Sequence, residues 1–506
     1  MTERVMMIGT EERPADQFSS TPAAAHPRGL YTLFFTEMWE RFSYYGMRAL
    51  LVLFMTDAVV KGGLGLTDKV ATSIYGLYTA GVYLAALPGG WVADRFLGAQ
   101  KTVWYGGLVI TCGQFLLVLP RTESFYLGLV LVVLGTGLLK PNISAIVGEL
   151  YPEGGARRDA GFTIFYMGIN LGAAISPLIT GYLGEKLNWH YGFAAAGFGM
   201  ILGLVQFRLT AKYLGNAGLR PGHLEAARQR DWLLLFGVVG GLLAVVVLAL
   251  TGMIQLNPIA LARQTAWVIL GVALLYFASA FFLFGLDRVE KKRVAVIAVL
   301  FLASAMFWSG FEQAGSSFNL FAARHTQRVI GFLNYEIPAG WLQSLGPIFV
   351  ISLAPVMAAL WVALARRNLN PSLPAKFAIG LLFLGAGFCV MGIASRFVAT
   401  GHKVWPTWLI STYLLHTFGE LCLSPVGLSS VTKLAPRRLV GQMMGLWFLA
   451  TSFGNLIAGL LAGEFTAQAV EQMSGRYFQI VLTTAGTGLL LLVLSKPVRA
   501  LMAGVK

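Results

Sequence analysis

The segment TEMWERFSYYGMR, residues 36–48, decides how this chain folds. It lies within an apolar stretch and yet contains four ionisable side chains, those of Glu37, Glu40, Arg41 and Arg48. At helical spacing these side chains form one stripe, with Glu40 about one step to its side. A charge at bilayer depth costs about 2.5–3.5 kcal/mol even on lenient insertion scales, so the stripe must face the protein interior or a water-filled cavity. The segment therefore predicts a membrane-spanning helix whose polar face points inward.

The composition of the whole chain is that of an integral membrane protein. Of its 506 residues, 56% are hydrophobic and only 12% are charged, whereas about a quarter of the residues of a soluble domain are charged. Apolar stretches long enough for a hydrocarbon core about 30 Å thick predict an all-α membrane fold. The fourteen predicted spans are 31–56, 73–93, 102–120, 124–147, 161–184, 191–208, 232–254, 265–286, 294–316, 341–365, 377–397, 404–430, 441–463 and 477–495.

The order of these spans predicts two six-helix bundles separated by an insert. The two inserted helices have no ionisable residue in their cores, so we expect a lipid-facing scaffold rather than a site. The N-terminal tail lacks the apolar segment of a signal peptide, and we expect none to be removed. The predicted parts are a cytoplasmic tail (1–30), the N-terminal bundle (31–209), a linker with the inserted helices (210–292), the C-terminal bundle (293–496) and a second tail (497–506).

The distribution of Lys and Arg predicts that both termini are cytoplasmic. With that orientation, most of the Lys and Arg outside the spans fall in cytoplasmic segments, as the positive-inside rule requires. The formal net charge of +15 is thereby explained, because the cations are spread over loops rather than gathered on one nucleic-acid-binding face. We therefore expect the lipid bilayer as a partner and no nucleic acid.

The motifs give no support to enzymatic or metal chemistry. Cys112, Cys389 and Cys422 lie in apolar spans without metal-ligand spacing and are interpreted as packing residues. The sequence contains no paired His-carboxylate metal motif and no G-x-S-x-G, which argues against an intramembrane hydrolase. We expect neither enzymatic activity nor a cofactor.

The sequence PGGWVADRFLGAQK, residues 88–101, resembles the loop signature of the major facilitator superfamily, G-x-x-x-D-R-x-x-G. In that superfamily an acid and a base at helix ends can latch the cytoplasmic side, which assigns gating to Asp94 and Arg95. The alternative is a solvated turn with a chance Asp-Arg pair. Residues 360–376 form a similar short basic turn, as expected for transporters built from repeats around a midplane site.

Several further strings resemble the proton-coupled oligopeptide transporter family. TEMWERFSYYG (36–46) matches the family motif E-x-x-E-R-F-x-Y-Y-G in full. The resemblance covers about residues 28–495 and implies proton-driven import of di- and tripeptides across a bacterial inner membrane, with protons as the coupling ion. It also implies the two inserted helices of bacterial members, and we expect a functional monomer. The other matching strings are GTGLLKPNIS (135–144), FTIFYMGINLGAAISP (162–177), FWSGFEQAGSSFNLFA (307–322), GELCLSPVGLS (419–429) and MMGLWFLATSFGN (443–455).

A zwitterionic peptide needs cations for its carboxylate and acceptors for its ammonium. Arg48 offers a planar fork and Lys140 a point charge, while Glu420 and Asn170 offer a charge and an amide oxygen to the ammonium. The tyrosines expected as neutral donors are Tyr44, Tyr45 and Tyr83. The resemblance assigns to this pocket Arg48, Lys140, Tyr45, Tyr83, Asn170, Glu312, Glu420, Ser424 and Trp447. For the aromatic members, simple packing is the alternative.

Two groups of residues are predicted to carry protons. If Glu312 pairs with Arg48 when ionised, protonation would release Arg48 to the peptide carboxylate and link the two occupancies. Glu37 and Glu40 beside Arg41 would form a second titrating cluster, although a purely structural ion pair is the alternative there.

The sequence departs from the family pattern in two places. In WLQSLGPIF, residues 341–349, Gly346 stands where the family usually has an Asn, so the ammonium loses one amide partner. Residues 73–91 lack the His that some members use for protons, which shifts proton carriage to carboxylates. His416 lies four residues before Glu420, but we interpret it as a satisfied helix residue.

Other solutes and another class of protein are the competing hypotheses. Nitrate, an amino acid or a drug could be carried on the same scaffold, because a fold does not fix its ligand. A channel would lack solute exchange and saturable uptake.

Overall fold

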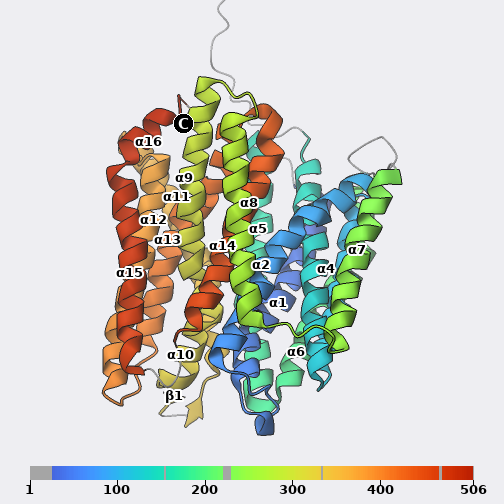
Figure 1. Cartoon of the computed structure of the whole chain (residues 1–506), viewed down its shortest axis with the longest axis vertical. Coiled ribbons are helices and arrows are strands. Elements are labelled where there is room, and N and C mark those ends of the chain that lie inside the picture. Colours follow the sequence, from blue (N-terminus) through green and yellow to red (C-terminus); the bar gives the residue numbers. More distant parts are fainter. Residues whose placement is uncertain (1–25, 153–154, 220–228, 332–333, 466–469, 505–506) are drawn as a thin grey trace, which may run out of the picture.

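The computed structural model describes residues 26–152, 155–219, 229–331, 334–465 and 470–504. Its long helices run side by side along one axis and form a bundle (Figure 1). Twelve helices in the described part are long and apolar enough to cross a membrane. Two further helices, α1 (Arg28–Thr56) with its charged stripe and α13 (Thr407–Leu434), have lengths in the same range as these twelve but are not counted among them. The predicted all-α membrane fold is confirmed, and each predicted span falls on one of these long helices.

The first six long helices pack on one another. Besides α1 they are α2 (Asp68–Val92), α3 (Ala99–Val118), α4 (Thr122–Glu149), α5 (Gly155–Gly181) and α6 (Trp189–Thr210). Helix α1 packs along α5 and α6, α3 packs along α4 and α6, and α2 packs along α4. These helices are called the first half below.

The last six long helices form the second half. Besides α13 they are α9 (Arg288–Phe311), α11 (Leu345–Arg366), α12 (Leu373–Ala399), α14 (Val440–Ala462) and α15 (Val470–Val493). Helix α12 packs along α13 and α15, while α9 packs along α14. Shorter elements are α10 (Ser317–His325), the 3-10 turns Glu312–Gly315 and Ala339–Ser344, α16 (Ser495–Leu501), and the antiparallel strands β1 (Val329–Ile330) and β2 (Tyr335–Glu336).

The two inserted helices, α7 (Gln229–Leu250) and α8 (Pro258–Phe282), belong to neither half. Helix α8 contacts α2 and α14, where the two halves meet. Helix α7 lies at the edge beside α4 (Figure 1), and no residue of its apolar stretch is buried. It meets the first half through Trp232, whose ring lies 4.6 Å from that of Phe96. This exposure fits the predicted lipid-facing scaffold.

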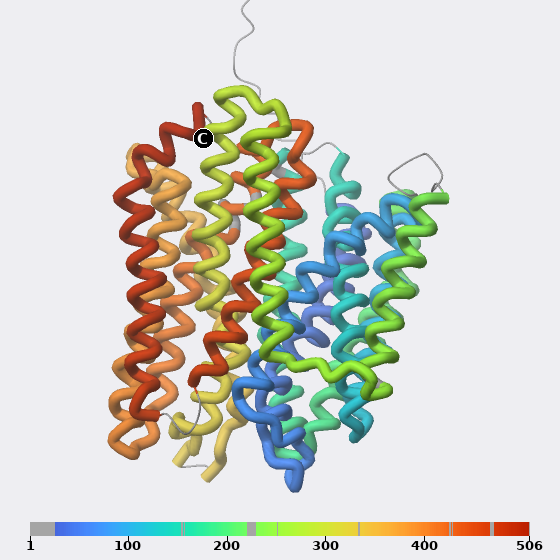
Figure 2. Tube along the Cα trace, in the orientation of Figure 1, coloured from blue at the N-terminus to red at the C-terminus, as the bar shows by residue number. Residues whose placement is uncertain are grey.

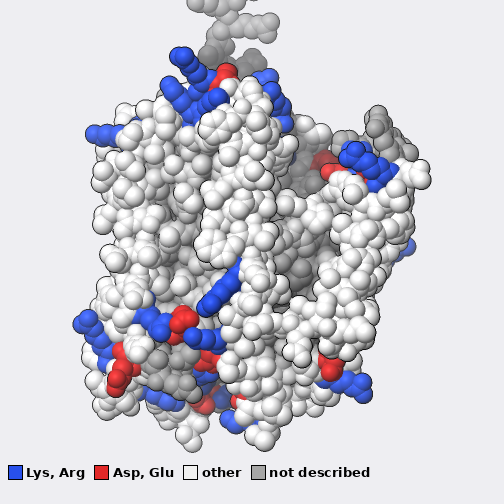
Figure 3. Space-filling view, in the orientation of Figure 1, with Lys and Arg blue, Asp and Glu red and all other residues white. Residues whose placement is uncertain are grey.

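The two ends of the bundle are chemically alike and structurally different. Charged side chains gather at both ends, and a broad, largely uncharged belt lies between them (Figure 3). The end that carries α10 and the β1–β2 pair is called the hairpin end below. Helix α16 and the C-terminus lie at the opposite end, as the chain trace shows (Figure 2). Helix α1 begins at that opposite end too, because α2, which follows it, begins at the hairpin end with Asp68 against Arg324 of α10.

The two halves cross closely at a pair of glycines. A Cβ on Gly459 of α14 would lie 2.6 Å from the Cα of Gly76 on α2, which is too short for any real contact. Small residues of this kind let membrane helices approach backbone to backbone. The crossing therefore holds α2 against α14 and places the polar faces of both halves around a common space.

Candidate functional site

The charged stripe of α1 is buried inside the first half. Arg41 lies with its Nε atom 3.1 Å from the Oε1 atom of Glu37, and it also pairs with Glu40. All three side chains are nearly inaccessible, and the Arg41 guanidinium lies over the ring of Tyr44, 5.1 Å from its centre. One oxygen of each carboxylate has no hydrogen-bond partner among the described residues. Two acids therefore share one base. The stripe faces the interior of the protein, as the segment predicts.

A second ion pair joins the two halves. The Nη2 atom of Arg48 lies 2.8 Å from the Oε2 atom of Glu312, and both side chains are buried. Arg48 also donates from its Nε atom to the Tyr75 hydroxyl at 2.6 Å. Glu312 follows the last residue of α9, where the helix breaks into a 3-10 turn. The break turns its carboxylate toward α1, so this ion pair joins the two halves.

A cavity of about 110 Å³ lies beside this pair, between the two halves. Most of the predicted site residues line this cavity, together with several residues that the sequence analysis did not assign to the site. Predicted residues at its wall are Tyr45, Arg48, Tyr83, Asn170, Glu312, Glu420 and Gly346. Sites for small ligands usually have ~300–1,000 Å³. The halves must therefore move apart before a peptide fits.

Lys140, Tyr44, Ser424 and Trp447 are predicted site residues outside this wall. Lys140 adjoins it, because its Nζ atom lies over the Tyr83 ring, 4.1 Å from the centre. Tyr44 is buried and Ser424 is half-buried. Trp447 is buried at the α13–α14 contact, where a Cβ on Gly427 would lie 2.5 Å from its ring.

The predicted gating residues lie at the end opposite the hairpin. Asp94 is exposed, and Arg95 lies 4.0 Å from Asp231 of α7. The segment with Asp94 and Arg95 therefore contacts the inserted helix α7 in this structure.

Contacts between the halves close the hairpin end of the cavity. Arg324 of α10 donates two hydrogen bonds to the Asp68 carboxylate on α2, at 2.7 and 2.8 Å. Glu185 of the first half accepts hydrogen bonds from the backbone N–H groups of Ala339 and Gly340, at 2.7 and 2.8 Å. Bidentate and charge-assisted bonds are the strongest of their kind. A solute in the cavity is thus separated from the solvent at this end.

Sequence reasoning missed several polar residues of the site, among them Gln343 and Thr417 at the cavity wall. Tyr75 holds Arg48, and its spacing of eight residues from Tyr83 on one helical face could have indicated it. Trp308 lies one helical turn before Glu312 and lines the cavity, and its indole N–H has no acceptor among the described residues. Tyr413 of α13 also lines the cavity and donates to the Ala314 carbonyl at 3.4 Å.

His416 lies in an aromatic environment rather than in a polar one. Its ring packs 5.1 Å from that of Phe388 and 5.6 Å from that of Phe318. A Cβ on Gly387 would lie 2.5 Å from its Nε2 atom, so the ring fills a notch in α12. The Nε2 atom has no hydrogen-bond partner among the described residues, whereas a backbone hydrogen bond with Leu384 engages the ring, which also borders the cavity.

Comparison with known proteins identifies the family. The family model described as POT family, PTR2, matches residues 100–479. The chain belongs to the POT family. A peptide transporter of Yersinia enterocolitica, YePEPT, is 42% identical over 491 residues, with 94% of this chain and 95% of the relative covered. A di-/tripeptide transporter of Lactococcus lactis subsp. cremoris is 37% identical, with 95% and 97% covered.

Solved structures of POT family members share the fold. A crystal structure of a variant peptide transporter in complex with alafosfalin has a TM-score of 0.87 and 41% identity, and 95% of this chain and 96% of that one are covered. The fold is therefore that of the major facilitator superfamily, with two inserted helices. POT family members are transporters, so this chain is a multi-pass transporter and not an enzyme.

Proposed function

We propose that this POT family transporter imports di- and tripeptides together with protons, by alternating access of the cavity between its halves. The observation that carries the proposal is the bipolar arrangement around that cavity. Cationic Arg48 and Lys140 extend from the first half, whereas the carboxylate of Glu420 extends from the second. A zwitterionic peptide presents the complementary charges at a matching pair of ends. The relatives named as peptide and di-/tripeptide transporters support this substrate class.

The Arg48–Glu312 pair would couple proton binding to peptide binding. When Glu312 is ionised, the 2.8 Å contact holds Arg48 and neutralises it. A proton on Glu312 removes the attraction, and Arg48 then meets the peptide carboxylate instead. Because the partners belong to different halves, the same event loosens the contact between the halves. Proton and peptide occupancy therefore favour the same conformational change.

The buried cluster on α1 is a second place for a proton. Arg41 pairs directly with both acids, so these three side chains carry one excess negative charge when both acids are ionised, and the nearby Lys140 offsets it only through space. An uncompensated buried charge is strongly destabilising. One proton shared by Glu37 and Glu40 removes that charge.

Uptake by proteoliposomes tests the proposed function directly. A proton that moves down a membrane potential contributes about 2.3 kcal/mol per 100 mV, enough to concentrate a peptide roughly fifty-fold. We expect accumulation of a labelled dipeptide to require an inward proton gradient and to disappear with a protonophore. Counterflow against unlabelled dipeptide, nitrate, an amino acid or a drug identifies the solute class. Concentrative uptake that persists without proton and sodium gradients would contradict symport.

Gly346→Asn is expected to raise the affinity for peptides with a free N-terminus. No atom lies within 4 Å of the position of a Cβ on Gly346, and the residue lines the cavity near Glu420, so the larger side chain has room. An amide oxygen facing the ammonium would contribute about 0.5–1.5 kcal/mol. Competition assays should compare a dipeptide with its N-acetylated analogue. An equal change for both would show that residue 346 does not contact the ammonium end.

Location, orientation and oligomeric state follow as part of the same proposal. We place the protein in a bacterial inner membrane with both termini in the cytoplasm, which the distribution of Lys and Arg supports. The cavity and both ion pairs are complete within one chain, which supports a functional monomer. Labelling of an added terminal cysteine by an impermeant reagent in intact and broken cells tests the orientation.

A further inference from the structure

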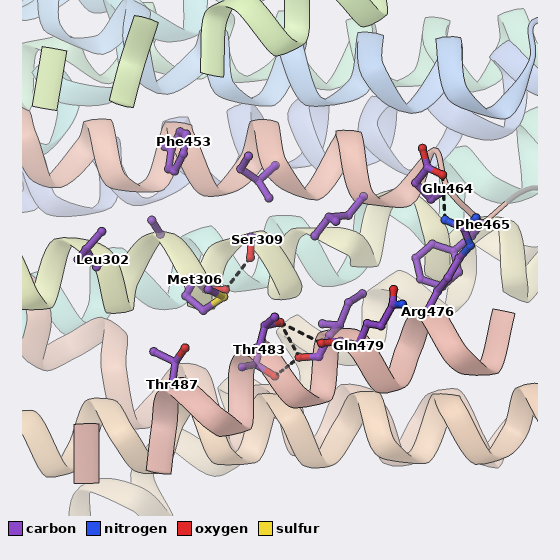
Figure 4. Close-up of a pocket in the computed structure, with 15 residues that line it drawn as sticks. Leu302, Met306, Ser309, Phe453, Glu464, Phe465, Arg476, Gln479, Thr483 and Thr487 are labelled. Atoms are coloured by element: carbon purple, nitrogen blue, oxygen red, sulfur yellow. Dashed lines mark hydrogen bonds and ion pairs between the residues drawn. The ribbon is translucent and has the colours of Figure 1, made fainter. Parts of the chain in front are cut away.

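A groove of about 660 Å³ lies on the second half, separate from the cavity between the halves. Its walls come from α9, α14 and α15 (Figure 4), and α15 packs mainly on α12 rather than on α14. The flank of α15 beside it belongs to the apolar belt, because Leu482 and Leu490 are 75% and 60% exposed. The groove therefore borders the hydrocarbon of the membrane.

The walls of the groove are apolar even where their residues carry hydroxyl groups. Thr484 donates to the carbonyl of Ile480 at 2.7 Å, and Thr483 donates to the same carbonyl at 3.0 Å. Ser309 of α9 donates to the Met306 carbonyl at 2.8 Å (Figure 4). These hydroxyls are satisfied within their own helices, and carbon atoms form the wall. Such a surface suits a hydrocarbon chain rather than a polar solute.

The hairpin end of the groove is charged. Glu464, just after α14, lies 2.8 Å from Arg476 of α15 and 3.3 Å from Lys69 of α2. Partial burial raises the pKa of Glu464. The hydrogen bonds from Arg476 and Lys69 lower it by more, so that its pKa lies below the ordinary value. The carboxylate is therefore ionised at neutral pH. Two cations and one anion leave one net positive charge at the mouth.

The length of the groove matches one leaflet of a membrane. From Arg476 to Thr487 the helix rises about 16 Å, and half of a hydrocarbon core is about 15 Å thick. We propose that the groove binds an anionic phospholipid of the leaflet at the hairpin end, with one acyl chain between α14 and α15 and its phosphate on Arg476 and Lys69. The exposed amide of Gln479, one turn deeper than Arg476, lies at the level of the ester carbonyls.

The bound lipid would link the two halves. Lys69 belongs to the first half and Arg476 to the second, so one phosphate in contact with both stabilises the closed hairpin end. A phosphatidylcholine headgroup is a weaker ligand, because it brings its own cation to a positive mouth. The site does not depend on which solute the cavity carries.

Photo-crosslinking tests the position of the acyl chain. The full chain is placed in nanodiscs with phosphatidylglycerol that carries a diazirine midway along one acyl chain, and labelled residues are mapped by mass spectrometry. We expect labels to concentrate on groove residues of α9, α14 and α15. Thr483→Trp, which fills the groove, should reduce this labelling at least severalfold, whereas Leu482→Trp on the adjacent outward face should not. Even labelling over the exposed faces of α7 and α8 would reduce the contact to ordinary lipid and overturn the proposal.

Native mass spectrometry tests the headgroup. Arg476→Gln should weaken retention of phosphatidylglycerol on the order of tenfold, because a charge-assisted bond to phosphate is lost. Lys61→Gln, an exposed cation at the same end, is the matched control and should have no effect. Phosphatidylcholine should compete poorly, and glycerol phosphate without acyl chains should not compete. Equal retention of both lipids by the native chain, or displacement by glycerol phosphate, would overturn the assignment.

Discussion

Glu312→Gln is expected to exchange peptides across the membrane but not to accumulate them. The amide has the shape of the protonated acid, and its oxygen can occupy the place of the carboxylate oxygen beside Arg48, while Tyr75 continues to hold that guanidinium. The fold should therefore persist. Without a titrating group at position 312, the proton cannot release Arg48. The accumulation of roughly fifty-fold available at 100 mV should fall toward equality of the two sides.

Paired assays on one preparation measure this separation. Gradient-driven uptake and counterflow of the same labelled dipeptide should be compared in native and Glu312→Gln proteoliposomes. Glu123→Gln provides a control, because Glu123 is an exposed carboxylate in the first turn of α4 and lies away from the cavity. Accumulation at the native level by Glu312→Gln would remove Glu312 from the proton pathway. Loss of counterflow as well would show that its role is in peptide binding.

Lys140→Ala is expected to weaken peptide binding more than any neutral change in the cavity. Lys140 has an aromatic ring beneath its ammonium and makes no direct ion pair among the described residues, although Glu37, Glu40 and Glu312 lie near enough to act on its charge. Its ammonium can therefore meet the peptide carboxylate, which would otherwise meet only Arg48 and neutral donors. Loss of a charge-assisted bond typically costs about 1.5–3 kcal/mol, or ~10- to 150-fold in affinity.

The ligand dependence of the Lys140→Ala defect identifies its cause. Peptides with a free C-terminus should lose far more affinity than their C-amidated counterparts, whose amide carries no charge. Lys140→Arg keeps the charge and tests whether charge alone is sufficient. If free and amidated peptides weaken equally, Lys140 acts in folding or proton coupling instead.

The sequence predicted the helices and the polar stripe because both depend on local patterns. Hydrophobic length placed each span, and the spacing of Glu37, Arg41 and Arg48 placed their side chains on the inward face. The break after Phe311 could not be predicted in this way. A Cβ on Gly315 would lie 2.1 Å from the Tyr75 hydroxyl, so the chain turns there to accommodate a residue 240 positions earlier.

The composition of the cavity shows the same limit. Asn170, Glu312 and Glu420 meet at one wall, as the resemblance implies, but Trp308 and Tyr413 reach it through helix rotations that no single segment specifies. Trp447 packs against Gly427, because a missing side chain on one helix makes room for a large one on another. Such complementarity is a property of pairs of distant residues. It becomes visible only when the helices are packed together.

The small volume of the cavity has a consequence for every binding experiment on this transporter. At about 110 Å³ it cannot hold a peptide, so only the fraction of molecules with an enlarged cavity is competent to bind. The apparent dissociation constant equals the intrinsic constant divided by that fraction. A variant that shifts this fraction changes the apparent affinity for all ligands by one common factor. A variant that alters a contact discriminates among ligands, and ratios between related peptides therefore distinguish recognition from conformational bias.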